Sequence, residues 1–338
     1  MNNLKIIFFM FATLFCLPIN AQESMEERVN NVENTVARLP RIIGNINLRY
    51  QYDDRDAANG FDVRRARLDF RGNVTKPVEY RIHLEFANTV RMLDANINWK
   101  INDYLALMVG QYKIPFSLEN QYNPNALEMI DNSLVITHLV NYADVSGIAT
   151  NGRDIGISLN GNFFQREGFS LINYSFGVFN GSGINRTDDN KNKDFSGTFS
   201  VNPFRHLTLA VSHYNGTVNG QQNNTFQRVR NGLGVKYDDN RLLIRSGYIH
   251  GKTDDFKSEG TYAVVGYFVH SKVQAVARYD YFKRDLDNDD TRQLNYAAGV
   301  NYLPVNNIRL QFNYTRRTQK DSNYIDNNYF VTQLWIRF

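Results

Sequence analysis

Charged side chains stand at alternate positions in several short segments of the sequence. Between residues 65 and 71, Arg65, Arg67, Asp69 and Arg71 alternate with small or apolar residues. Alternate side chains of a β-strand point to opposite faces of the sheet, so this spacing places the charged groups together on one face. Guanidinium and ammonium groups gathered on one face attract phosphate, carboxylate and other anions. The first chemistry that the sequence indicates is therefore anion binding.

The same alternation in later segments extends this charged face, on which basic residues outnumber acidic ones. If this face is enclosed by an apolar, low-dielectric surface, its excess of positive charge concentrates anions. The alternative is that the basic residues only pair with acidic neighbours and fix the shape of the sheet; we expect such pairs for Arg67 with Asp69 and for Arg81 with Glu79. The candidate residues of the anion pathway are Arg65, Arg67, Arg71, Arg81, Lys100, Lys113, Arg228 and Arg230.

The elements that would carry these residues are strands. Roughly 16 segments of about 10 residues alternate in this way from Ile42 to Phe338, and that length lets a tilted strand cross a membrane. Short turns alternate with longer polar loops, which is typical of barrels whose turns face the periplasm and whose loops face outside. The sequence predicts an all-β fold: a transmembrane antiparallel β-barrel of about 16 strands over residues 42–338.

The composition agrees with a barrel. The chain contains 20 Tyr and 23 Phe, and its mean hydropathy is −0.46. No apolar run after the first residues is long enough for a transmembrane helix. Half of each barrel strand is polar, and aromatic girdles mark the two membrane interfaces, so a polar average with many aromatic residues is expected.

The first 21 residues are typical of a signal peptide. Lys5 precedes an apolar run over residues 6–17, Pro18 ends the run, and Ala21 provides a small residue at the cleavage position. An uncleaved anchor is the alternative. Cleavage would remove Cys16, the single cysteine, so the exported chain would contain no disulfide. We expect export to the outer membrane of a Gram-negative bacterium.

Residues 22–41 form a separate segment with a helical pattern. The heptad spacing predicts a short N-terminal helix that ends at Pro40. It is either a helix on the periplasmic surface or a short coiled coil that supports an oligomer. Its apolar positions are Met25, Val29, Val32, Val36 and Leu39.

The longest loop, residues 114–152, interrupts the alternation. It is too apolar for a solvated loop, and it contains a predicted short helix over residues 125–130. Folding into the barrel would cover its apolar residues and narrow the pore; the alternative is that they cover a neighbouring subunit. The candidate constriction residues are Phe116, Glu119, Asn120, Glu128 and Asp131.

Four blocks of the sequence resemble one family, the phosphate-selective porins O and P. The resemblance implies a trimeric 16-stranded barrel with a constricting third loop, which lets small hydrophilic solutes, such as phosphate or other small anions, diffuse passively through a basic lumen. It marks Arg64, Arg65, Gln111 and Lys113 as family-typical positions. The blocks are VRRARLDFRG (63–72), EYRIHLEF (79–86), LDANINW (93–99) and GQYKIPFSLEN (110–120).

The chain is shorter than the named porins of this family and lacks a dense ladder of basic residues. A general non-selective porin and a barrel with a mainly structural, anchoring role are therefore the alternatives. The resemblance also implies that the terminal strand, which ends on the aromatic Phe338, is presented to the barrel-assembly machinery. The expected partners are outer-membrane lipid, transported small anions and two further copies in a homotrimer, but no nucleic acid.

Catalytic motifs are absent from the sequence. It contains no G-x-S-x-G and no H-E-x-x-H pattern, and its six histidines are scattered. We therefore expect no enzyme activity, no cofactor and no metal site. A plugged, energy-coupled receptor would need a plug domain before the barrel, and only about 20 residues stand between the predicted signal peptide and Ile42.

Overall fold

The computed structural model describes residues 25, 28, 39–55, 59–219, 225–320 and 326–338. The chain divides into two units, Met1–Pro40 and Arg41–Phe338. The predicted signal peptide and nearly all of the predicted N-terminal helix lie outside the described residues. Among the residues that are described, no helix is both long enough and apolar enough to cross a membrane.

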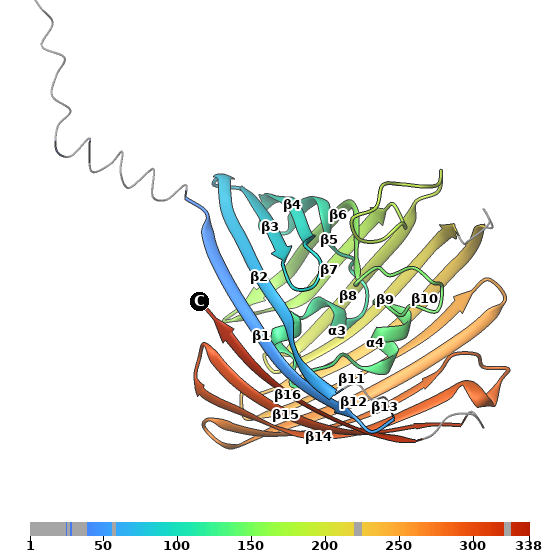
Figure 1. The fold of residues 1–338 in the computed structure, drawn as a ribbon. Coiled ribbons are helices and arrows are strands. Elements are labelled where there is room, and N and C mark those ends of the chain that lie inside the picture. The colour runs from blue at the N-terminus through green and yellow to red at the C-terminus, as the bar shows by residue number, and fades with distance from the viewer. Residues whose placement is uncertain (1–24, 26–27, 29–38, 56–58, 220–224, 321–325) are drawn as a thin grey trace, which may run out of the picture. The chain divides into compact units, whose positions relative to one another are not determined.

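Sixteen antiparallel strands in the described part of the chain close into a barrel, which confirms the predicted fold class (Figure 1). Each strand pairs with its neighbours in sequence, and β1 pairs with β16 to close the ring. The strands are β1 (Arg41–Asp53), β2 (Asn59–Thr75), β3 (Val78–Glu85), β4 (Arg91–Asn102), β5 (Leu105–Lys113), β6 (Arg153–Arg166), β7 (Phe169–Phe179), β8 (Asp194–Phe204), β9 (Leu207–Asn219), β10 (Thr225–Asp238), β11 (Leu242–Thr253), β12 (Phe256–His270), β13 (Val273–Lys283), β14 (Arg292–Val305), β15 (Ile308–Gln319) and β16 (Asn327–Arg337).

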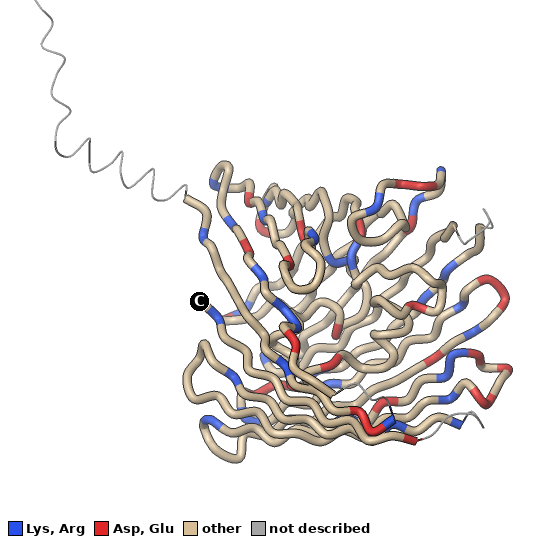
Figure 2. Tube along the Cα trace, in the orientation of Figure 1, with Lys and Arg blue, Asp and Glu red and all other residues tan. Residues whose placement is uncertain are grey.

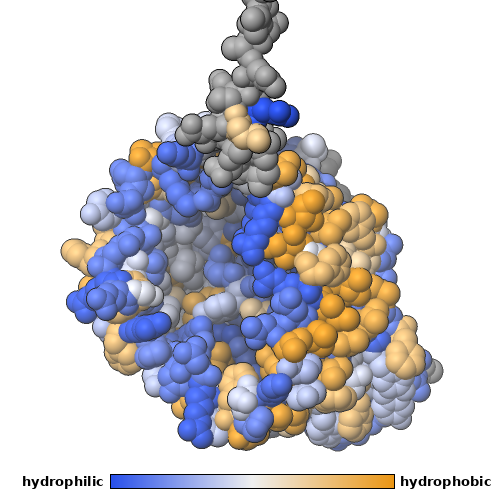
Figure 3. Space-filling model, turned by 90° about the vertical axis from the view of Figure 1, so that its left-hand side faces the viewer, coloured by the Kyte–Doolittle hydropathy of each residue, from blue (hydrophilic) through white to orange (hydrophobic). Residues whose placement is uncertain are grey.

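Apolar side chains cover the outside of the barrel and polar ones face its interior. In β1, Ile46 and Leu48 are 38% and 44% exposed, whereas Asn47 between them is fully buried. The view towards one end of the barrel shows hydrophobic surface on its flank and hydrophilic surface around a central hollow (Figure 3). Lipid outside and water inside thus account for the two-residue period of the sequence.

Several register shifts interrupt the strand pairing, and two β-bulges among them change the direction of side chains near the third loop. Opposite Asn47 and Leu48 of β1, the register of β2 jumps from Arg65 to Val63, so Arg64 is an extra residue. A second jump in β4 leaves Leu93 unpaired between Asp94 and Met92. Strict alternation places Leu93 on the outer face with its apolar neighbours; that prediction is wrong, because the bulge leaves Leu93 completely buried.

The loop between β5 and β6, hereafter the third loop (residues 114–152), carries short helices. They are α3 (Leu118–Gln121), the 3₁₀ turn η1 (Pro124–Ala126) and α4 (Leu134–Leu139); a further 3₁₀ turn, η3 (Asp289–Thr291), precedes β14. The predicted helix over residues 125–130 is wrong. Its backbone groups bond to side chains of the barrel wall instead: Arg309 donates to the Leu127 carbonyl at 3.0 Å, and the Ile130 amide donates to Asn313 Oδ1 at 2.9 Å.

The third loop lies against the inner face of the barrel wall (Figure 1). Its two ends meet where the Ile114 amide donates to the Gly152 carbonyl at 3.0 Å. Val135, Ile136 and Leu139 of α4 belong to a buried apolar cluster that also contains inward-facing residues of β11, β12 and β13. The loop therefore covers its apolar residues within its own barrel.

Candidate functional site

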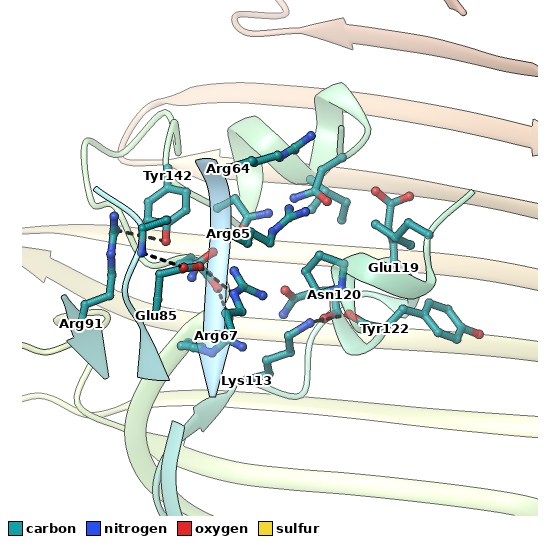
Figure 4. Close-up of a pocket in the computed structure, with 18 of the residues that line it drawn as sticks. Arg64, Arg65, Arg67, Glu85, Arg91, Lys113, Glu119, Asn120, Tyr122 and Tyr142 are labelled. Atoms are coloured by element: carbon teal, nitrogen blue, oxygen red, sulfur yellow. Dashed lines mark hydrogen bonds and ion pairs between the residues drawn. The ribbon is translucent and has the colours of Figure 1, made fainter. Parts of the chain in front are cut away.

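A cavity of about 500 Å³ lies between the wall formed by β1–β6 and the third loop (Figure 4). Seven basic and two acidic residues are among those that line it, so its lining is strongly positive. Figure 2 shows several basic segments along β2, interspersed with acidic ones. The charged lining residues are Arg49, Arg64, Arg65, Arg67, Arg91, Lys113, Arg153, Glu85 and Glu119.

Two of these basic residues are held by buried carboxylates. Arg67 Nε donates to Glu85 Oε2 at 2.7 Å, and Glu85 also accepts from the Ala66 amide at 2.8 Å. Arg153 Nε donates to Asp94 Oδ1 at 2.8 Å. These neutralised pairs fix the wall of the cavity, and a solute would gain little additional attraction from them.

Arg65 and Lys113 differ, because neither has an acidic partner among the described residues. Arg65 is only 9% exposed, its side chain makes no hydrogen bond or ion pair within the described part of the chain, and its Nη1 is buried without a partner. Lys113 Nζ donates to the carbonyl oxygens of Asn120 and Tyr122, each at 2.5 Å. Neither side chain is thus ion-paired with a carboxylate, and both line the same cavity (Figure 4).

The bulge in β2 explains how Arg64 reaches the cavity beside Arg65. Consecutive residues of a regular strand point to opposite faces, but the extra residue lets both guanidinium groups point inward. Arg64 then pairs with Asp131 of the third loop, with Nη2 and Oδ1 2.7 Å apart. Strict alternation could not place Arg64 in the lumen.

Two other predicted pathway residues, Arg71 and Arg81, lie outside this cavity and share one carboxylate. Their Nη2 atoms are 2.6 and 2.8 Å from Asp69 Oδ2, and Arg81 Nη1 is 3.1 Å from Asp94. Lys100 is also separate and lies 2.6 Å from Glu79, with both side chains substantially exposed.

The expected pairs Arg67 with Asp69 and Arg81 with Glu79 are therefore wrong. Arg67 lies directly opposite Glu85 on the neighbouring strand and pairs with it. Asp69 is instead bonded to Arg71 and Arg81. The carboxylate that bonds to Arg81 likewise comes from the neighbouring strand: Arg81 Nε donates to Asp69 Oδ1 at 2.9 Å.

Arg228 and Arg230 are 3% and 2% exposed and belong to a different, enclosed cluster. Arg230 Nη2 lies 3.4 Å from Asp144 Oδ1 in the third loop, and Arg228 Nη2 lies 3.6 Å from Asp194 Oδ2 in β8. Their contacts attach the end of the third loop to the wall. They do not line the cavity that contains Arg65.

The five predicted constriction residues occupy different surroundings. Glu119 and Asn120 line the cavity. Phe116 is 1% exposed and packs edge-on against Tyr214, with ring centroids 6.3 Å apart. Glu128 pairs with Arg245 at 2.7 Å, and Asp131 pairs with Arg64.

Besides Arg64, sequence reasoning missed Arg91 and Arg153 of the cavity. Each is the first residue of its strand, where alternation gives no guidance on direction. Arg91 Nη1 donates to the hydroxyl of Tyr142 in the third loop at 3.3 Å. Within the described ranges, no group of three or more potential metal ligands is present.

A closed 16-stranded antiparallel barrel with an apolar outer band and a loop packed against its inner wall defines the porin class of outer-membrane channel. The sequence matches the family model for phosphate-selective porin O and P over residues 42–243 and 236–338. The chain belongs to this family. It is an outer-membrane porin of a Gram-negative bacterium, and a channel rather than an enzyme.

Solved structures share the fold at low sequence identity. The anion-selective porin from Comamonas acidovorans is 13% identical, with a TM-score of 0.71 over 88% of this chain and 99% of that one. The outer-membrane channel DcaP of Acinetobacter baumannii is 13% identical, with a TM-score of 0.63 over 88% and 97%. The trimer form of OmpT from Vibrio cholerae is 12% identical, with a TM-score of 0.64 over 88% and 99%. No curated protein sequence matches the chain.

Proposed function

We propose that this porin gives passive diffusion to small hydrophilic solutes and prefers anions, phosphate or others, at the cavity beside the third loop. The observation that carries the proposal is Arg65, a buried guanidinium that lines the cavity without an acidic partner in the described chain. A buried cation that lacks a counter-charge attracts an anion strongly, because its field is poorly screened there.

The remaining basic residues support this role in different ways. Lys113 adds a second cation without a carboxylate, whereas the carboxylates bonded to Arg67 and Arg153 restrict those two residues to shaping the wall. Outside the cavity, three further basic residues are paired with carboxylates: Arg71, Arg81 and Lys100. They only add to the average positive potential along the lumen.

The proposal extends to assembly. The trimer form of Vibrio cholerae OmpT supports a homotrimer, and the family resemblance supports recognition of Phe338 by the barrel-assembly machinery. Residues 1–21 would act as the signal peptide that directs the chain to the envelope.

The test is the reversal potential of single channels in planar bilayers under a KCl gradient. The wild-type pore is expected to prefer chloride, and Arg65→Gln to lower the anion-to-cation permeability ratio by about twofold or more, whereas Arg65→Lys retains the preference. Arg71→Gln is the matched control, since it removes one lumenal guanidinium outside the cavity and is expected to have a smaller effect.

Two results would oppose the proposal. Equal permeability to both ions in the wild-type pore would leave a general non-selective porin. A folded protein without conductance would favour the structural, anchoring role.

A further inference from the structure

Four asparagine side chains line the cavity that contains Arg65: Asn88, Asn132, Asn141 and Asn151. None of them forms a side-chain hydrogen bond with another residue in the described ranges, and Asn151 Nδ2 is buried without a partner. The neighbouring Asn120 provides a contrast, because its amide donates to the Gly152 carbonyl at 3.2 Å. The cavity therefore has both donor and acceptor capacity that the protein does not use.

The positive side of the cavity likewise has unused donors. Arg64 Nη1, Arg65 Nη1 and Arg91 Nε are buried and lack a hydrogen-bond partner among the described residues. All three residues line the same cavity as the asparagines. Buried donors without partners are unfavourable, and oxygen atoms of a solute would satisfy them.

The chemistry of these groups distinguishes between kinds of anion. A guanidinium only donates hydrogen bonds, so an oxyanion satisfies it completely. A primary amide donates and accepts, and its carbonyl oxygen needs a donor that a fully ionised oxyanion lacks. Hydroxyl groups do both, so a solute with an anionic end and several hydroxyls matches the arginines and the amides together.

The size of the cavity agrees with such a solute. At about 30 Å³ for each water-sized group, a volume of about 500 Å³ holds roughly 16 of them. A hexose phosphate fits within this space together with some of its hydration water, whereas orthophosphate would occupy only a small part of it. We infer that the cavity prefers hydroxylated organic anions, that is sugar phosphates or sugar acids, over inorganic phosphate. This inference rests on the anion preference proposed above.

The experiment measures how strongly added solutes block the chloride current of single wild-type pores. Glucose 6-phosphate is expected to block at a concentration about tenfold lower than inorganic phosphate, because its hydroxyls add two or more hydrogen bonds. Butyl phosphate is the control for size, and it is expected to block like inorganic phosphate. Gluconate is likewise expected to block at a lower concentration than butyrate, and equal block by these two carboxylates would show that the preference does not include sugar acids.

The asparagines are tested with Asn132→Leu combined with Asn141→Leu. Asn88 and Asn151 are left unchanged because their positive φ angles of 62° and 50° would strain most other residues. The double variant is expected to lose the advantage of glucose 6-phosphate and to keep the block by inorganic phosphate, which also shows that the pore is folded. Asn98→Leu, in β4 outside the cavity, is the control and is expected to behave like the wild type.

Inorganic phosphate or butyl phosphate that blocks as strongly as glucose 6-phosphate would overturn the inference, and so would an unchanged preference in the double variant. These outcomes differ from failure of the proposed function, which would show as a wild-type reversal potential without anion preference.

Discussion

Arg64 of β2 and Asp131 of the third loop form an ion pair, with Nη2 and Oδ1 2.7 Å apart. The pair lies where two cavities meet: Arg64 lines both the cavity around Arg65 and a second one of about 460 Å³, which Asp131 also lines. Asn132, Asn141 and Tyr142 are shared by the two cavities as well. The ion pair therefore ties the wall to the loop at the boundary between the two spaces.

Asp131→Asn is expected to loosen the third loop at this boundary. Removal of the negative charge leaves Arg64 without its counter-ion, and the loop loses one of its attachments to β2. Single-channel recordings at neutral pH should show increased current noise and brief closures. Asp289→Asn is the matched control, since Asp289 pairs with Lys283 and Lys320 far along the sequence from the third loop. Equal noise in both variants would contradict a specific role for Arg64 with Asp131.

Acid should reproduce the effect of Asp131→Asn in the wild-type pore. Burial in the barrel raises the pKa of Asp131, but the positive charges of Arg64, Arg49 and Arg278 outweigh burial and lower this pKa from 3.8. Because the folded-state pKa is the lower one, the stabilisation is complete above the ordinary carboxyl range and is lost as the pH falls through the folded-state value. Wild-type recordings should stay quiet in mild acid and become noisy only below that range, whereas Asp131→Asn is noisy throughout.

The buried pair of Glu128 and Arg245 should matter for stability. Their Oε2 and Nη2 atoms are 2.7 Å apart, and the side chains are 7% and 5% exposed. Glu128→Ala leaves a buried guanidinium and should lower the free energy of unfolding by about 3 kcal/mol. Urea unfolding in lipid vesicles, followed by tryptophan fluorescence, measures the loss.

Glu79→Ala is the control for that measurement, since its pair with Lys100 is exposed and should contribute less than about 1 kcal/mol. Glu128→Leu combined with Arg245→Met should cost less than the sum of the single variants, because neither charge is then left unpaired. Equal losses for Glu79→Ala and Glu128→Ala would show that the loop does not depend on this buried pair.

Gly110 of β5 should tolerate no side chain. Its φ is +125°, and an added Cβ would lie 2.2 Å from the Ala95 carbonyl oxygen and 2.8 Å from the Asn96 Cα of the neighbouring strand. Gly110→Ala is expected to cost at least about 2 kcal/mol, because the backbone of two paired strands must move. The folded fraction on unheated gels reports the effect. Gly60→Ala, where nothing lies within 4 Å, should fold normally, and an equal result for both glycines would refute the steric argument.

The alternation of the sequence predicted the strands because lipid and water act on opposite faces of each one. About 16 strands were predicted over residues 42–338, and the barrel has 16. Arg65 and Lys113, which the alternation places on the charged face, both line the cavity. The bulge at Arg64 could not be predicted. Arg64 and Arg65 are the same residue type, so the sequence does not show which of them faces the lumen. The bulge at Leu93 was hidden by an apolar residue that also suits the outer face.

The third loop limited the prediction of the site. The conformation of residues 127–130 depends on hydrogen bonds with Arg309 and Asn313 of β15, which lie more than 180 residues further along the chain. The asparagines of the cavity belong to loops, where no periodicity indicates direction. Only the folded loop brings them next to Arg65.

The pairing of β1 with β16 has a kinetic consequence. Among the described strands, all the remaining pairings join strands that are neighbours in sequence, and only this seam joins the first strand to the last. At the seam, the Gly44 amide lies 2.7 Å from the Phe338 carbonyl oxygen, and the Phe338 amide lies 3.0 Å from the Gly44 carbonyl oxygen. Hairpins between neighbours close short loops rapidly, whereas the seam closes a loop that contains the whole barrel and carries the largest entropic cost. We therefore expect formation of the seam to be the slow step that separates an open curved sheet from a sealed channel.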